Sequence, residues 1–446
     1  KEDLDPHSPT VTMVVKTIIY GVRPSGNQLS AGFEKLADYV EEHHPVHTAG
    51  ARALTNSSYV DDILNPANSL DEAKKTADSL AFTLGLAGMS VKGFSYPHQP
   101  PPADVSTDGE TIGLMGHVWR PEEDTLSPDI KPVFFGRAKR GKLPTIITGD
   151  FTPALKEHFT RRVLLGKVNA VYDPIGLLTP VTSRFKLDLS ELCLEEKLDW
   201  DDQVPDRYLE TWIKNVNDIQ RLREIRFRRT IIPPDAADTK VNLIVSCDAS
   251  KDIAISCVHA RVRRKNGEFS CQLLTAKSKI VKQLTVPKAE MRAAVMSAVL
   301  GHTSKFNLEN QYEGAIYVTD SSIVLYWLSS DQRVLQTLVR NAVIEIRRFT
   351  DMGQWYHVST DLNVADIGTR STEPDAINLY SDWQHGKEWM KGKQESFPLK
   401  TVDELTLSNE ENRLMKAETK IKEIFLNVLE FVMKLKRNQQ GINCIV

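Results

Sequence analysis

The part of the chain after residue 240 reads as an α/β segment, and this segment limits the possible fold more than any other. Residues 241–250 (VNLIVSCDAS) form a short apolar run that ends in polar residues, as a buried strand does. Residues 286–301 carry Pro near the start and Gly at the end, a pattern typical of a helix. Residues 314–322 (GAIYVTDSS) again read as a buried strand. We therefore predict an α/β segment that begins at residue 241.

Four acidic residues fall at the ends of these predicted elements. Asp248 and Asp320 end strands, whereas Glu290 and Asp366 lie near the starts of helices. Strand ends and helix starts can meet at one edge of an α/β sheet, where such folds usually place their sites. Each acid taken singly could be an ordinary cap. The ordered set instead predicts two Mg²⁺ ions held about 3.5–4 Å apart for phosphodiester cleavage, because clustered carboxylates repel one another without a cation.

A second pair of acids lies in NSSYVDDIL, residues 56–64. Asp61 and Asp62 are adjacent inside a short apolar run. The residues before them favour a strand and Asp-Asp suits a tight turn, so we predict a β-hairpin with the acids at its tip. Mg²⁺ would offset the repulsion between the two carboxylates. On these residues alone, a solvated turn without function remains the alternative.

Length and composition set broad limits on the chain. Its 446 residues suggest two to four domains, and the hydrophobic share of 41% is enough for ordinary cores. A net charge of -3 argues mildly against a nucleic-acid binder, although basic clusters occur, as in RVRRK at 261–265. The five cysteines are odd in number and form no CxxC pair, which indicates neither a disulfide framework nor a zinc site. No run of 18 apolar residues predicts a membrane span.

Longer motifs connect the two groups of acids to one family. YVDDIL and the preceding TIIYGVRPSGNQL (17–29) resemble reverse-transcriptase segments. VYDPIGLLTPVTSRFK (171–186) and KLDWDDQVP (197–205) are similar to a connecting region, and CDAS, TVPKAEM, VTDSSIVLYWL and NVADIGTRS match an RNase H domain in order. Over about residues 11 to 390 the chain thus resembles the Pol polyprotein of BEL/Pao-type LTR retrotransposons. Part of that family carries the label Pao retrotransposon peptidase, but no Asp-Thr-Gly or Asp-Ser-Gly occurs here, so we expect no protease activity.

The resemblance implies a multidomain chain of the α/β and α+β classes. It places a partial reverse-transcriptase palm with the YVDD hairpin in residues 1–95. A thumb-like or connection-like region would follow in residues 96–235. An RNase H-like domain, with a mixed sheet flanked by helices, would occupy residues 240–380. Residues 381–446 would form a C-terminal helical tail or linker.

The resemblance also implies an RNase H-type endoribonuclease. The expected reaction is Mg²⁺-dependent hydrolysis of the RNA strand in an RNA/DNA hybrid, with two Mg²⁺ ions at the site. Asp248, Glu290, Asp320 and Asp366 would be the catalytic residues and the metal ligands. The alternative is a catalytically inert or co-opted nucleic-acid-binding relic that keeps the fold without the chemistry.

For the polymerase part, the resemblance implies that Asp61 and Asp62 are catalytic residues and metal ligands. A complete site of this kind would hold two Mg²⁺ ions. The third polymerase aspartate and the fingers subdomain would lie upstream of residue 1, so we expect this polypeptide not to polymerise alone. The expected partners are an RNA/DNA hybrid, a template-primer, and upstream polymerase and downstream integrase segments. A membrane is not among them. The expected location is cytoplasmic virus-like particles and then the nucleus, in the context of DNA integration.

Three positions bear on whether the RNase H site works. Ile255 stands where the family usually has Gly, and we expect its bulk to crowd the nucleic acid. The loop before Asp366 lacks the histidine that cellular relatives use for product release, and His357 lies earlier, in a predicted strand with a structural role. Asn363 could either cap the following helix or contact the substrate.

Overall fold

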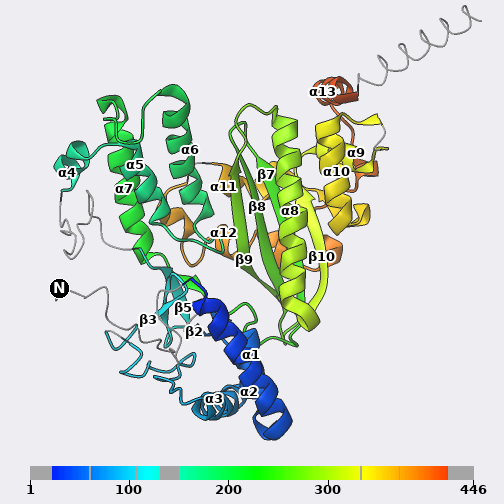
Figure 1. Cartoon of the computed structure of the whole chain (residues 1–446). Coiled ribbons are helices and arrows are strands. Elements are labelled where there is room, and N and C mark those ends of the chain that lie inside the picture. The colour runs from blue at the N-terminus through cyan, green and yellow to red at the C-terminus, as the bar shows by residue number, and fades with distance from the viewer. Residues whose placement is uncertain are drawn as a thin grey trace, which may run out of the picture. The chain divides into compact units, whose positions relative to one another are not determined.

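The computed structural model describes most of the chain and divides into two units, each considered by itself below (Figure 1). Unit 1 holds the residues up to Met115 and Trp119–Asp124, and unit 2 holds Gly116–Val118 and the residues from Thr125 onward. None of the described helices is long and apolar enough to cross a lipid bilayer. The described ranges are 23–59, 62–106, 108–130, 150–331, 334–370 and 372–419.

The described part of unit 1 includes three α-helices and one small hairpin. The side chain of Ser69 accepts a hydrogen bond from the N–H of Glu72 at 3.2 Å and so caps α3, as expected for a Ser-x-x-Glu start. Leu54 of α2 packs against Leu80 and Leu84 of α3. The helices are α1 (Ser25–His43), α2 (Thr48–Asn56) and α3 (Leu70–Leu86).

The hairpin at YVDD is present in unit 1. Strand β1 (Ser58–Tyr59) pairs antiparallel with β2 (Asp62–Ile63), with Tyr59 opposite Asp62. Asp62 is exposed. Asp61 lies outside the described residues. The predicted hairpin is therefore confirmed, although Asp62 is paired within β2 and is not at the tip. The metal-binding roles of both aspartates stay predictions.

A mixed five-stranded sheet forms the centre of unit 2 (Figure 1). Its strand order is β11-β10-β7-β8-β9, in which β8 runs antiparallel to β7 and β9, and β10 runs parallel to β7 and β11. This agrees with the mixed sheet predicted for residues 240–380. The strands are β7 (Val241–Ala249), β8 (Ile253–Arg263), β9 (Phe269–Ile280), β10 (Tyr312–Thr319) and β11 (Trp355–His357).

The two faces of this sheet are buried in two separate hydrophobic cores. Side chains alternate between faces along a strand, so Leu243 and Val245 of β7 enter one core while Ile244 enters the other. The core with Leu243 is covered by α8, which lies across the sheet in Figure 1, and by α9 and α10. These helices are α8 (Val286–Leu308), α9 (Ser322–Ser329) and α10 (Thr337–Phe349).

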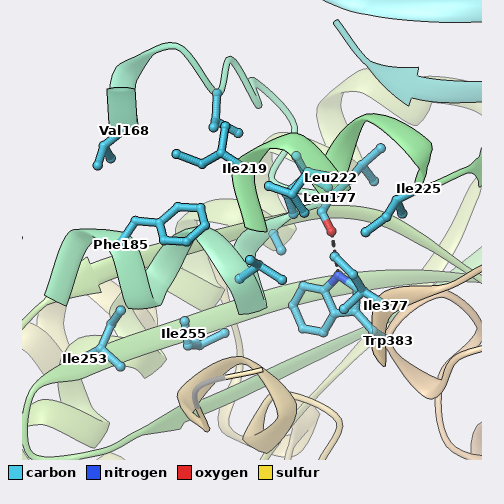
Figure 2. Packing of buried hydrophobic residues seen from close by; sticks show 14 of the residues in the cluster. Val168, Leu177, Phe185, Ile219, Leu222, Ile225, Ile253, Ile255, Ile377 and Trp383 are labelled. Carbon is cyan, nitrogen blue, oxygen red and sulfur yellow. Dashed lines mark hydrogen bonds between the residues drawn. The ribbon is translucent and has the colours of Figure 1, made fainter. Parts of the chain in front are cut away.

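The second core joins the sheet to helices that precede it by many residues. Phe185 of α6 and Ile219 of α7 share this core with Ile253 and Ile255 of β8 (Figure 2). Trp383, which is fully buried, donates its indole N–H to the carbonyl of Leu177 at 2.8 Å. The predicted division at residues 235–240 therefore falls between segments that share one core, although the domain boundaries as a whole remain predictions. The helices are α4 (Thr152–Glu157), α5 (Arg161–Asn169), α6 (Thr179–Glu195) and α7 (Leu209–Arg221).

A loop before α6 closes the outer edge of β9. The carbonyl of Ile175 accepts hydrogen bonds from the N–H of Ala276 at 2.8 Å and the hydroxyl of Thr275 at 2.9 Å. Gly176 has φ of +78°, and a Cβ there would lie 1.8 Å from the carbonyl oxygen of Ala276. Only glycine fits this approach, and the edge strand is protected from pairing with another chain.

The segment predicted as a tail or linker begins inside unit 2. Trp383 and Met390 are fully buried, and the guanidinium of Arg261 donates to the carbonyl of Met390 at 2.9 Å. Further along, the backbones of His357 and Lys400 exchange two hydrogen bonds at the edge of β11. The first part of the predicted tail therefore covers the sheet. Helix α11 (Asp366–Thr369) precedes this segment, and α12 (Asp382–His385) and α13 (Asn409–Thr419) lie within it.

The described residues also form short strands outside the five-stranded sheet. The antiparallel pair β5–β6 places Leu126 opposite Phe227, and Phe227 is buried in the same core as Trp383. The strands are β3 (Ile112–Leu114), β4 (His117–Arg120), β5 (Thr125–Pro128) and β6 (Phe227–Arg228).

Candidate active site

Two of the four predicted acids lie at the same edge of the sheet. Asp248 is the last residue but one of β7, and Asp320 directly follows β10. The two strands are parallel, and Cys247 lies opposite Thr319 in their register. The acid that follows each of these paired residues therefore lies at the carboxyl end of neighbouring strands, as the sequence predicts.

Glu290 reaches this edge from α8. Its Oε2 accepts a hydrogen bond of 2.5 Å from the hydroxyl of Ser321, the residue after Asp320. The hydroxyl of Ser321 also accepts from the N–H of Val324 at 3.4 Å and so caps α9. Ser321 thus caps α9 and holds the carboxylate of Glu290 close to the end of β10.

The fourth acid comes from the short helix α11. Asp366 is its first residue and pairs with the guanidinium of Arg370 at 2.6 Å. One turn later, Thr369 donates its hydroxyl to Oδ2 of Asp248 at 2.6 Å. The structure therefore brings α11 to the end of β7, and all four acids gather at one edge of the sheet.

Burial and mutual repulsion shift two of these acids strongly. Burial raises the pKa of Asp248 to about 6, with further increases from the charges of Asp320 and Asp366, against the hydroxyl of Thr369, which lowers it. Burial likewise raises the pKa of Glu290 to about 8, and the charges of Asp320 and Asp248 add to this increase. A group of acids that resists ionisation in this way is typical of functional sites.

The four acids suit a hard divalent cation, because such an ion prefers carboxylate oxygens and would offset their mutual repulsion. Their side chains are not oriented as a metal site. Within the described ranges, no three His, Cys, Asp or Glu side chains are arranged to hold a metal ion. Each acid bonds instead to its own protein partner, so a shared ion would require the carboxylates to turn toward a common centre. These partners are Thr369, Ser321, Asn363 and Arg370.

Asn363 is a site residue whose role the sequence left open. It is almost fully buried, and its amide donates to the carbonyl of Cys247 at 2.9 Å and to Oδ1 of Asp320 at 3.2 Å. The oxygen of the same side-chain amide, Oδ1, accepts a hydrogen bond from the N–H of Ala365 at 3.2 Å. Asn363 therefore orients Asp320 and caps the turn before α11, and the NVAD spacing is the only sequence signal for it.

His357 also contacts the site, through the backbone carbonyl of Asp320 and not through an acidic side chain. Its Nε2 lies 3.1 Å from the carbonyl oxygen of Asp320, which can only accept, so this nitrogen carries the proton. Burial lowers the pKa of His357 and so favours the neutral ring, against the opposing effects of the hydrogen bond to Asp320 and of its charge. The structural role predicted for this histidine agrees with that contact.

The expectation for Ile255 is wrong. This side chain lies opposite Asp248 in the β7–β8 ladder, but it is fully buried and belongs to the core beneath α6. A Cβ at Gly368 of α11 would lie 2.8 Å from Cγ2 of Ile255. The missing side chain at Gly368 thus makes room for the isoleucine, which packs against the protein and not against nucleic acid.

This contact predicts a strong coupling between the two positions. Gly368→Ala should lower the free energy of unfolding by about 1–3 kcal/mol, because the added methyl overpacks against Ile255. Ile255→Ala should cost about 2–5 kcal/mol by leaving a cavity. In the double variant the new methyl partly fills that cavity, so the combined loss should be smaller than the sum by about 1 kcal/mol or more. Urea unfolding of the four proteins measures this, and strictly additive losses would contradict the contact.

Comparison with known proteins gives one family match. Residues 160–321 match the model described as Pao retrotransposon-like RNaseH-like domain. This range covers α5 to α7 together with Asp248, Glu290 and Asp320. It therefore includes the helices and also strands of the sheet with which they share a core. No curated protein matches the chain.

Solved structures with some similarity include viral and cellular proteins. The foamy viral protease-reverse transcriptase in complex with an RNA/DNA hybrid is 12% identical over 76% of this chain and 38% of its own length, with a TM-score of 0.39. A second structure of that viral protein, in complex with double-stranded DNA, is 11% identical over 75% of this chain and 49% of its own length, with a TM-score of 0.38. The N-terminal RNase H domain of a Mycobacterium tuberculosis protein is 14% identical over 31% of this chain and 96% of its own length, with a TM-score of 0.21. This chain thus spans less than half of either viral chain. The family match confirms the resemblance that the motifs indicate, because residues 160–321 match a Pao retrotransposon-like RNaseH-like domain.

Proposed function

We propose that this protein is an RNase H-type endoribonuclease that hydrolyses the RNA strand of RNA/DNA hybrids and depends on Mg²⁺. One observation carries the proposal: Asp248, Glu290, Asp320 and Asp366, far apart in sequence, meet at the carboxyl edge of parallel strands. The raised pKa values of Asp248 and Glu290 support it, because such crowding has no structural benefit without a cation.

In this proposal the four carboxylates hold Mg²⁺, and Asn363 and His357 keep Asp320 in place through its side chain and its carbonyl. Bound Mg²⁺ would supply positive charge that acidifies a water molecule and stabilises the leaving oxygen. Water adds to phosphorus as the P–O3′ bond breaks, so one product ends in a 3′-hydroxyl and the other in a 5′-phosphate. The hybrid would be recognised by its A-form shape and 2′-hydroxyl groups.

A second candidate is an inert nucleic-acid-binding relic, and one observation favours it. Each acid already has a hydrogen-bond or ionic partner in the protein, and Arg370 neutralises Asp366 without a metal ion. In such a protein the acids would be retained only as parts of the fold.

Cleavage of a labelled hybrid separates the two candidates. The purified chain should cut the RNA strand in Mg²⁺ and stop when EDTA is added, and it should leave double-stranded DNA of the same sequence intact. The same preparation should not extend a primer, since the palm is partial by resemblance. Folded protein that binds the hybrid but does not cleave it over a range of Mg²⁺ concentrations would contradict the nuclease proposal and support the relic.

A further inference from the structure

Thr369 makes the one described side-chain hydrogen bond to Asp248. Its Oγ1 lies 2.6 Å from Oδ2 of Asp248 and 3.0 Å from the carbonyl oxygen of Asp366. Both neighbours are acceptors, and a hydroxyl has one proton to donate. The shorter bond to a carboxylate is charge-assisted and therefore the stronger of the two.

The position of this hydroxyl is determined by contacts on both sides. Gly368, the preceding residue, packs so closely on Ile255 that no side chain fits between them. Ile255 is in turn the ladder partner of Asp248. The backbone of α11 is therefore held at one distance from β7 and β8, and this distance places Thr369 beside Asp248.

We propose that Thr369 is a positioning residue that orients the Asp248 carboxylate for metal binding and links it to the helix that carries Asp366. The inference rests on the proposed function and deepens it. One oxygen of Asp248 is held by the hydroxyl, which restricts rotation of the carboxylate and leaves the other oxygen for the cation. The hydroxyl also lies 3.0 Å from the carbonyl oxygen of Asp366 in its own helix, so it links the carboxylate of Asp248 to the start of α11.

Two substitutions separate the hydroxyl from the shape of the side chain. Thr369→Val keeps the branched shape and removes the donor, whereas Thr369→Ser keeps the donor. A matched control lies three residues away. The hydroxyl of Thr372 lies within hydrogen-bond distance of the carbonyl oxygens of Ile367 at 2.9 Å and Arg370 at 2.7 Å, and its described hydrogen bonds include no acid. Thr372→Val thus removes a hydroxyl from the same segment without touching the acids.

The readout is ion binding, measured independently of cleavage. Mn²⁺, used as a probe for Mg²⁺, is titrated into each folded protein and the free ion is followed by electron paramagnetic resonance. Asp248→Asn gives the background from ions bound elsewhere. We expect Thr369→Val to weaken the Asp248-dependent binding by about 10- to 100-fold, as loss of a residue that orients a metal ligand does. Thr369→Ser and Thr372→Val should bind as the parent does.

Cleavage of the hybrid supplies the second readout. Thr369→Val should need more Mg²⁺ for half-maximal rate and recover much of its rate at high Mg²⁺, which a general loss of folding would not produce. Parent-like ion binding by Thr369→Val, or equal weakening by Thr372→Val, would overturn the positioning role. A parent that binds no ion beyond the Asp248→Asn background would instead overturn the proposed nuclease function, so the two failures are distinct.

Discussion

Asp248→Asn is expected to abolish cleavage of the hybrid and at the same time to stabilise the protein in the absence of Mg²⁺. Loss of one carboxylate from the proposed site removes part of the charge that binds the metal ion. Metal ions supply several kcal/mol of transition-state stabilisation, so the rate should fall by ~10³-fold or more. Single-turnover cleavage of a labelled hybrid measures this.

The gain in stability follows from the raised pKa of Asp248, which burial and the neighbouring acids bring to about 6. A carboxyl group whose pKa is higher in the folded state binds its proton more tightly there, so it favours folding at low pH and this benefit is lost as pH rises through about 6. At pH 8 ionised Asp248 should therefore cost the fold on the order of 3 kcal/mol, which Asn avoids. The stabilisation should be clear at pH 8 and should disappear near pH 4.

A surface carboxylate gives the matched control. Asp235 is an exposed residue that pairs with Arg264 before the start of β7, away from the acidic edge. Asp235→Asn makes the same change of charge and should alter neither the cleavage rate nor the pH dependence of unfolding by more than a small amount. An Asp248→Asn variant that cleaves at the parental rate, or that is destabilised at pH 8, would contradict the assignment of Asp248 to a crowded metal site.

Among the described glycines of unit 2, Gly176 is the one at which substitution by alanine is expected to cause the largest loss of stability. The alanine would have to adopt φ of +78°, which costs an L-residue about 1–2 kcal/mol. Its Cβ would also lie 1.8 Å from the carbonyl oxygen of Ala276 and 2.5 Å from the carbonyl carbon. These are backbone atoms of β9, so no side chain can rotate away to relieve the contact. The loop must leave β9, and we expect a total loss of about 3 kcal/mol or more.

The effect should extend beyond the loop, because two anchors follow Gly176 directly. Asp173 accepts hydrogen bonds from the N–H groups of Leu177 at 2.9 Å and Leu178 at 2.8 Å, and the carbonyl of Leu177 accepts from buried Trp383. Urea unfolding followed by circular dichroism and tryptophan fluorescence measures the loss.

A second glycine serves as the control for this substitution. Gly166 lies within α5, and a Cβ there would meet nothing within 4 Å. Gly166→Ala should raise stability by about 0.5–1 kcal/mol, since alanine favours the helix. A Gly176→Ala protein as stable as the parent would show that the loop does not approach β9 as closely as described.

Much of the site could be predicted from local sequence patterns. The acids at Asp248 and Asp320 follow apolar runs, and the strand ends that these runs predict do meet at one edge. Ser321, which directly follows Asp320, caps the next helix, as serine often does. The hairpin at residues 58–63 was predicted from two strand-forming residues and an Asp-Asp turn. Such features depend on a few consecutive residues, so periodicity and turn chemistry are enough to find them.

The partners of the acids could not be predicted in the same way. Thr369 bonds to Asp248 across 121 positions of the sequence, and Asn363 bonds to Asp320 across 43. Threonine and asparagine are common near helix ends for local reasons, so neither residue type signals a distant carboxylate. Only the packing of α11 on the sheet decides which acid each of them meets.

The sequence by itself determined the buried strands before Asp248 and Asp320, the helix over residues 286–301, the hairpin around YVDD and the placement of the acids at element ends. These features depend on spacing along the chain. The tertiary structure alone decided that α5 to α7 share a core with the sheet, that Ile255 is buried against Gly368 and that residues from Trp383 to Met390 return to the same core. Ile255 shows the physical reason. A bulky residue at a position usually held by glycine is tolerated only if its neighbour is small, and that neighbour lies 113 residues away, where no local pattern connects the two.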